Sequence, residues 1–175
     1  RMTERDREKV SAIHKEIQEE SMHHTHSIIC MDANETLTEE GRIQVSPDGT
    51  LTPSGSRGSA GGPTMAWYNT SKTDVRAQIA AMTREGAPYP TMEDMTHVQP
   101  AADDKVIHSA IDIIYSSNTL TSRLLDCSLY DQPRRWGQAD RKGPGRSSYH
   151  KAIAATWNWL DLWPPQPDNH PAEAS

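Results

Sequence analysis

The chain contains no phenylalanine, only two cysteines and no apolar run long enough to cross a bilayer. Without Phe, its five Trp, seven Met and five Tyr must supply most of the large core side chains. Twelve Pro and ten Gly favour long loops, so we expect a modest core for 175 residues, a length that fits one domain or most of a larger one. No secretory signal is visible, and we expect Cys30 and Cys127 to be free, buried thiols in a reducing, intracellular compartment.

Positive charge is also scarce. Eighteen Lys and Arg stand against 24 Asp and Glu, and the formal net charge of −6 argues against a general nucleic-acid coat protein. The 123–151 region is nevertheless basic, through Arg123, Arg134, Arg135, Arg141, Lys142, Arg146 and Lys151. This region is either a basic patch beside an acidic metal site or a solvated loop.

The sequence pattern predicts two helices, with one strand between them and three strands after the second. The first helix covers 3–20 with an N-cap at Thr3, and the second covers 73–85 and ends at Gly86. The first helix carries a narrow apolar stripe: Val10, Ile13 and Ile17. The expected strands are short and mostly apolar: 27–31 (buried), 106–116, 124–130 and 151–159. Long irregular loops are expected at 38–66 and 131–147, and three histidines within 23–26 are interpreted as a polar linker.

Polar side chains stand at three points along these strands. Asp32 and Asn34 follow the first strand, and alternate residues of a strand point the same way, so both can share one site at a sheet edge. Asp112 interrupts an apolar run, where a carboxylate is costly to bury unless it is paired or binds a metal. His150 precedes the last strand and can reach an adjacent edge. Taken singly, Asp112 and His150 are also consistent with surface side chains.

Taken in order, these motifs resemble a known family. Asp32-x-Asn34, Ile111-Asp112-x-Ile114 and Ser148-x-His150 resemble the Gly-Asp-x-Asn, Arg-Ile-Asp-x-Ile and Ser-Asp-His motifs of the endonuclease/exonuclease/phosphatase family. The sequence of residues 32–37 is particularly similar to the reverse transcriptase-associated endonuclease domains of non-LTR retrotransposons. The resemblance covers residues 5–160 and corresponds to the C-terminal two-thirds of a full family domain.

The resemblance implies a fold and a chemistry. The expected fold class is α/β: a two-sheet α/β sandwich over 1–163, incomplete at its N-terminus and followed by a disordered tail at 164–175. The implied activity is Mg²⁺- or Mn²⁺-dependent phosphodiester hydrolysis by an endonuclease, with DNA favoured over other nucleic acids and phosphate esters. The implied partners are the nucleic acid and the missing N-terminal half of the domain, with no membrane. We therefore expect the chain to be the C-terminal part of a longer open reading frame.

The same resemblance assigns roles to four residues. Asp32 orients or deprotonates the attacking water, and Asn34 donates a hydrogen bond to a phosphate oxygen. His150 stabilises charge on the phosphoryl group. Asp112 pairs with His150, holding its ring and favouring its protonated form.

The sequence departs from the family pattern at three positions. Met31 replaces the Gly of the first motif, Ala110 replaces the Arg of the second, and Tyr149 replaces the Asp of Ser-Asp-His. A neutral Tyr cannot substitute for a carboxylate ligand of Mg²⁺, so the metal ligands stay unknown. The family's N-terminal metal-binding Glu has no counterpart either. These departures favour one alternative, a degenerate or truncated nuclease-like domain without turnover.

Two further interpretations start at Asp32. In a haloacid-dehalogenase-type phosphatase Asp32 would be the nucleophile, but Asn34 cannot act as the general acid of that family. A calcium-binding loop is excluded because its sixth position, normally Gly, is Leu37 and its twelfth, normally Glu, is Ile43.

Overall fold

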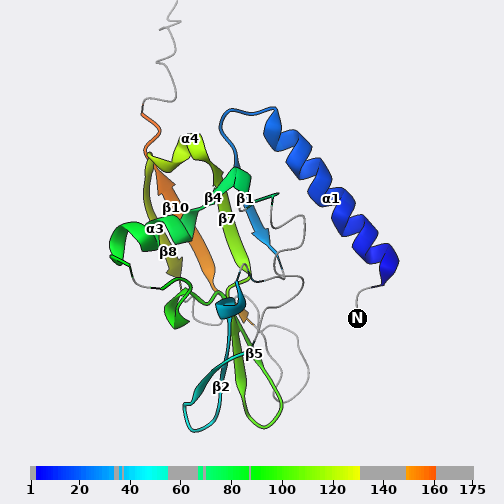
Figure 1. Cartoon of the computed structure of the whole chain (residues 1–175), viewed down its shortest axis with the longest axis vertical. Helices are drawn as coiled ribbons and strands as arrows, with labels where there is room; N and C mark the ends of the chain where they lie inside the picture. Colours follow the sequence, from blue (N-terminus) through cyan, green and yellow to red (C-terminus); the bar gives the residue numbers. More distant parts are fainter. Residues whose placement is uncertain are drawn as a thin grey trace, which may run out of the picture.

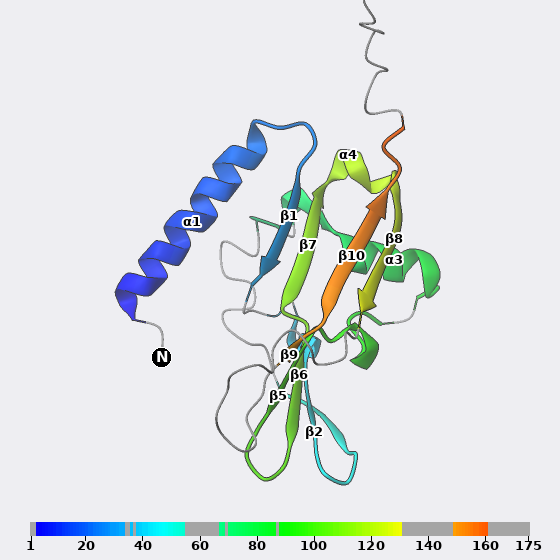
Figure 2. The same cartoon turned by 180° about the vertical axis from the view of Figure 1, so that it is seen from behind.

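The computed structural model describes residues 3–33, 36, 38–54, 67–68, 70–86, 88–130 and 149–160. They form a mixed α/β structure in which the described strands pair antiparallel (Figures 1 and 2). The helical elements are α1 (Glu4–Met22), α3 (Val75–Thr83), α4 (Asn118–Thr121) and the 3-10 turns η1 (Glu39–Gly41) and η2 (Met92–Asp94). The strands are β1 (Ile28–Asp32), β2 (Arg42–Val45), β3 (Leu51–Pro53), β4 (Lys72–Asp74), β5 (His97–Pro100), β6 (Val106–Ser109), β7 (Asp112–Ser117), β8 (Leu124–Tyr130), β9 (Tyr149–His150) and β10 (Ala152–Trp157).

The upper part of the molecule is built on β7. One sheet has the order β1-β7-β4, and a second pairs β10 with β8. Both views place β10 beside β7, so β1, β7, β10 and β8 lie side by side (Figures 1 and 2). Helix α1 lies outside β1, whereas α3 covers β7 and β8 from one face.

The lower part is a five-stranded sheet with the order β3-β2-β6-β5-β9. Its hairpins project away from the end of β7 at which Asp112 lies (Figure 2). Strand β6 leads into β7 after a break at Ala110 and Ile111, and β9 leads into β10. The chain therefore passes between the two parts close to Asp112 and His150.

Two apolar clusters stabilise the upper part. One joins α3 to β7, β8 and β10 through Val75, Ile114, Leu120, Leu124 and Trp157. On the α1 side, Tyr68, Ile113 and Tyr115 form the other, with the Tyr68 and Tyr115 rings stacked at 5.1 Å between centroids. Burial of such aromatic side chains supplies the core volume that the absence of Phe leaves to Tyr and Trp.

The first helix confirms the expected N-cap but not the expected stripe. Thr3 and Asp6 form a capping box, in which the Thr3 hydroxyl accepts from the Asp6 N–H and the Asp6 carboxylate accepts from the Thr3 N–H. Val10 and Ile13 are 41% and 55% exposed, and Ile17 alone of the stripe packs against a core cluster. Helix α1 thus presents most of its apolar stripe to solvent.

The second helix begins two residues later and ends two residues earlier than expected. Residues 72–74 pair with β7, and the Asp74 carboxylate then caps α3 by accepting from the Arg76 and Ala77 N–H groups. Gly86 follows the helix with φ of +82°, the left-handed conformation expected of a helix stop. Val75 and Ile79 join the core as expected, but Met82 is exposed.

The strand expected at 106–116 is wrong as one unit, because it divides into β6 and β7. The Ala110 N–H donates to the Gly41 carbonyl, and the Ile111 carbonyl accepts from the Ala33 N–H, both at 2.8 Å. These bonds satisfy the backbone outside any ladder, so the chain turns from one sheet to the other. Asp112 is therefore the first residue of a strand and not an interruption within one.

The remaining strands agree only in part with those predicted from the sequence. Strand β8 matches 124–130, and β10 is shorter than 151–159. The irregular loop expected at 38–66 is wrong for 42–53, which form a hairpin whose Gly49 N–H donates to the Ser46 carbonyl at 2.9 Å. Strand β5 lies in the proline-bearing stretch after α3, where no strand was predicted.

The expected burial of 27–31 is wrong. Strand β1 is an edge strand on which Ile28, Cys30 and Asp32 are exposed and only the alternate residues are partly covered. Both cysteines are free, as expected, but Cys30 is exposed and Cys127 is half-buried.

Several sequence predictions fall outside the described residues. These are Asn34, the basic loop at 131–147 and the tail at 164–175. Among the helices that are described, none has the length and apolar character needed to span a bilayer.

Candidate functional site

Two of the expected site residues face each other across one strand pair. Asp32 is the last residue of β1 and Asp112 the first of β7, and the antiparallel register sets them directly opposite each other. The side chains of directly opposed residues lie on the same face, about 5 Å apart at Cβ. The carboxyl end of β1 and the amino end of β7 thus form one carboxylate-bearing edge.

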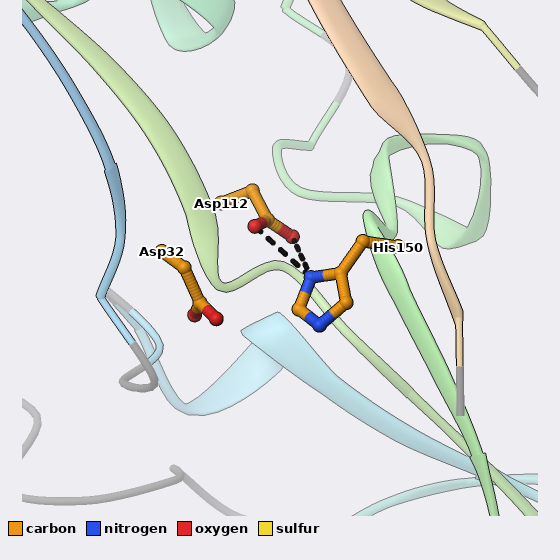
Figure 3. A group of neighbouring side chains, drawn as sticks. All are labelled: Asp32, Asp112 and His150. Atoms are coloured by element: carbon orange, nitrogen blue, oxygen red, sulfur yellow. Dashed lines mark hydrogen bonds and ion pairs between the residues drawn. The ribbon is translucent and has the colours of Figure 1, made fainter. Parts of the chain in front are cut away.

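His150 reaches this edge from β9. Its strand is held by β5, with His150 opposite His97. The His150 Nδ1 lies 3.0 and 3.1 Å from the two carboxylate oxygens of Asp112, which is the contact that the sequence predicted (Figure 3). Protonated at Nδ1, the imidazole donates to Asp112 and keeps Nε2 for another partner. The Asp112 side chain is 18% exposed and that of His150 is 43% exposed, so the pair is accessible from solvent.

The three side chains converge on one point (Figure 3). One ligating atom from each of Asp32, Asp112 and His150 can be chosen so that all three lie within 4.8 Å of one another. Metal–ligand bonds of about 2.0–2.2 Å place two ligands of one ion at most about 4.4 Å apart, so a small side-chain movement suffices to seat an ion. The donor set fits a divalent cation, and one imidazole beside two carboxylates suits Mn²⁺ or Zn²⁺ better than Mg²⁺.

A groove runs from this edge along the sheet. It has a volume of about 310 Å³ and is lined by β1, β7 and β10, including Cys30, Asp32, Asp112, Lys151 and Ile153. Lys151 brings a positive charge to a groove that otherwise carries carboxylates. The pKa of the Cys30 thiol is raised by burial, so the thiol is neutral at pH 7.

A second cavity shares Asp112 with the groove. Its volume is about 320 Å³, and it also contacts Asp74, Arg76 and Tyr89. Burial raises the pKa of Asp74 and outweighs the hydrogen bonds that it accepts from the α3 backbone. Asp112 therefore separates an open groove from a more enclosed space beside α3.

Two residues near the site had no signal in the sequence. His97 is buried, and its ring lies 4.5 Å from that of His150 between centroids. It stands in the unpredicted β5, so no motif marks it. The sequence marked Lys151 only as one of several basic residues of the 123–151 region, and its place in the groove follows from the position of β10 next to β7.

The remaining predicted residues are less well placed by the structure. Asn34 lies outside the described residues, as does the side chain of Tyr149, whose backbone pairs with Val98. In the polar linker, His24 contacts Glu20 and His26 contacts Thr119, each at 3.0 Å. Over the described ranges, Asp32, Asp112 and His150 form the only group suited to a metal ion.

The arrangement combines an oriented imidazole with a second carboxylate on an accessible edge. Such a set can bind a divalent cation, or it can move a proton at Nε2 while Asp112 holds Nδ1. No protein-family model matches the chain, and comparisons with curated proteins and with solved structures also give no match.

Proposed function

We propose that this edge is part of a divalent-metal-dependent phosphodiesterase site, of the endonuclease type, in an α/β sandwich like that of the endonuclease/exonuclease/phosphatase family. The observation that supports the proposal is the Asp112–His150 pair at 3.0 Å with Asp32 opposite on the neighbouring strand. These residues come from three segments widely separated in sequence, in the order that the family motifs require.

In the proposed mechanism each residue has a role set by its position. Asp32, exposed at the strand end, accepts a proton from the attacking water or orients that water. His150, held at Nδ1 by Asp112, directs Nε2 towards the phosphoryl oxygen or the leaving group. A divalent ion, when bound, would polarise the phosphate; because this mechanism uses both nitrogens of His150, the candidate protein ligands are the carboxylates of Asp32 and Asp112.

The proposed substrate is nucleic acid, and DNA is favoured because the sequence of residues 32–37 resembles that of retrotransposon endonucleases. Lys151 beside the two carboxylates offers a counter-charge to a phosphate in the groove. The net charge of −6 makes local contacts, and not the overall field, responsible for binding.

One observation supports a second candidate, a nuclease-like domain without turnover. Asp32 is exposed and His150 is 43% exposed, so water is not excluded from the edge. An open site weakens electrostatic stabilisation of a transition state, because solvent screens each charge. In this alternative the residues bind a cation but do not cleave.

Both candidates are tested by one assay. The chain is incubated with supercoiled plasmid and Mn²⁺ or Mg²⁺, and nicking is compared with EDTA controls. We expect metal-dependent nicking that falls at least about 100-fold in Asp32→Ala and His150→Gln. The matched control is Asp126→Asn, which alters an exposed carboxylate on β8 and should leave nicking unchanged. If the chain does not cleave DNA, RNA or small phosphate esters with either of these ions, the domain without turnover is the correct alternative.

A further inference from the structure

We infer that Thr96 is a positioning residue of this site, one that holds the Asp112 and His150 segments in register with each other. Thr96 immediately precedes β5 and is completely buried. It touches neither the groove nor the second cavity. Its effect on the site therefore acts through the backbone of other residues.

The Thr96 hydroxyl fixes the start of β7. Its Oγ accepts hydrogen bonds from the backbone N–H groups of Ile111 and Asp112, both at 3.1 Å, and it donates to the Ser109 carbonyl at 3.3 Å. A hydroxyl has one donor and two acceptor positions, and all three are used here. These bonds lie where the chain leaves β6 and enters β7, so they define the point from which the Asp112 side chain projects.

The Thr96 backbone fixes the other partner of the pair. Its carbonyl accepts from the Lys151 N–H at 2.6 Å, directly after His150. Its N–H donates to the Ser109 carbonyl at 3.0 Å, which anchors it to β6. One residue thus bonds to the segments on both sides of the 3.0 Å contact between His150 and Asp112.

The positioning role of Thr96 should require a side-chain hydroxyl. Valine fills nearly the same space but has no acceptor, so the N–H groups of Ile111 and Asp112 would lose a partner in a buried place. Serine keeps the hydroxyl and loses only a methyl group. Partners that orient metal ligands in this way typically change metal affinity by 10- to 100-fold when they are removed.

The test uses the full chain with Thr96→Val, Thr96→Ser and the matched control Thr73→Val. Thr73 also loses hydroxyl hydrogen bonds, to Asn118 and Thr121, but it lies on β4 at the far end of β7. The measurements are amide hydrogen exchange by NMR, Mn²⁺ affinity by calorimetry, and global stability in urea. If Thr96→Val does not fold, Thr96→Cys replaces it, because a thiol is a weak acceptor of similar size.

In Thr96→Val we expect the Asp112 amide to exchange at least about tenfold faster relative to the β10 amides, and Mn²⁺ affinity to fall about tenfold or more. Thr96→Ser should restore both to within about twofold, and Thr73→Val should change neither. The inference is overturned if Thr96→Val keeps wild-type protection at Asp112, or if serine does not rescue.

Only the effect of Thr96 on metal binding and turnover rests on the proposed function; its effect on the position of Asp112 does not. A chain that neither cleaves nor binds Mn²⁺ would refute the proposed function. The exchange rate of the Asp112 amide in the three variants would still decide whether Thr96 positions that residue.

Discussion

Asp32 and Asp112 occupy directly opposed positions at the ends of β1 and β7, although like charges opposite each other destabilise a strand pair. The His150 ring contacts one of these carboxylates, that of Asp112. A divalent cation at the same edge would offset both. This relationship links folding stability to metal binding.

Mn²⁺ should therefore stabilise the wild-type chain, and Asp32→Asn should remove that effect. At a Mn²⁺ concentration of 100 times Kd, the free energy of unfolding should rise by about 2.7 kcal/mol in the wild type. Asp32→Asn keeps the size of the side chain but loses a charged ligand, so its gain should be below about 1 kcal/mol. Urea unfolding with and without Mn²⁺ measures both values. Equal gains in the two proteins would place the ion elsewhere.

The carboxylate of Asp94 should dominate the acid sensitivity of the fold. Arg84 donates two hydrogen bonds to it, at 2.7 and 2.8 Å, and Arg76 lies 3.7 Å away. Burial by itself would raise the pKa of Asp94, but the bonds from Arg84 and Thr91 outweigh it and hold that pKa below its usual value. Asp94→Asn should lower the free energy of unfolding by about 3 kcal/mol at pH 7.

The pH dependence of this difference follows from the lowered pKa. A depressed carboxyl pKa contributes stability that is complete above the unfolded-state value of about 3.9 and is lost as pH falls through the lower folded-state value. The gap between wild type and Asp94→Asn should thus be constant from pH 7 to about 5 and close below about pH 4. Urea titrations across this range measure it, and a gap that persists at pH 2 would contradict the assignment.

The two thiols should differ in reactivity although both are free. Burial raises the pKa of Cys127 to about 11, and it raises that of Cys30 in the exposed strand β1 as well. With iodoacetamide at pH 8, Cys30 should be alkylated at least about tenfold faster than Cys127, because it is more accessible. Mass spectrometry of peptides from the native protein measures the two rates. In urea the rates should become equal, and faster native labelling of Cys127 would disprove the predicted order.

Tyr149→Asp should increase metal-dependent turnover. The change places a carboxylate directly before His150 in β9, where the resembling family has one, and carboxylates are the ligands that Mg²⁺ and Mn²⁺ prefer. The plasmid-nicking rate of Tyr149→Asp is compared with that of Tyr149→Asn, which adds a side chain of the same size without charge. A rise in both variants would show that loss of the Tyr ring, and not the new carboxylate, is responsible.

The elements that the sequence predicts well are those with local signals. The Thr3 N-cap, the left-handed Gly86 shortly after α3 and the apolar run of β8 depend on neighbours in the chain, and the structure has all three. Strands β2, β3 and β5 are stabilised by pairing across the five-stranded sheet. The β2–β6 and β5–β9 pairings are non-local, whereas β2–β3 and β5–β6 are hairpins, and the Thr, Gln and Pro residues of these short strands are typical of loops.

Only the site residues that belong to a recognisable sequence motif could be predicted. Residue chemistry indicated only that Asp112 needs a partner or a metal ion, and the family resemblance implied that this partner is His150. Thr96 and His97 could not be predicted, because threonine and histidine are common in loops and their roles depend on β5. The exposure of Cys30 was also hidden, because an edge strand and a central strand have the same short apolar pattern.

The break at Ala110 and Ile111 separates the hairpins of the five-stranded sheet from the strands that carry the candidate site. The hairpin turns at 46–50 and 101–105 lie at the far ends of the five-stranded sheet, whereas Asp32, Asp112 and His150 lie where it joins the upper strands. Loop tips tolerate insertions far better than paired strands do. The hairpins can therefore lengthen or change charge while the three side chains keep their spacing. The selection of molecules that reach the edge and the chemistry of the three side chains can thus evolve independently.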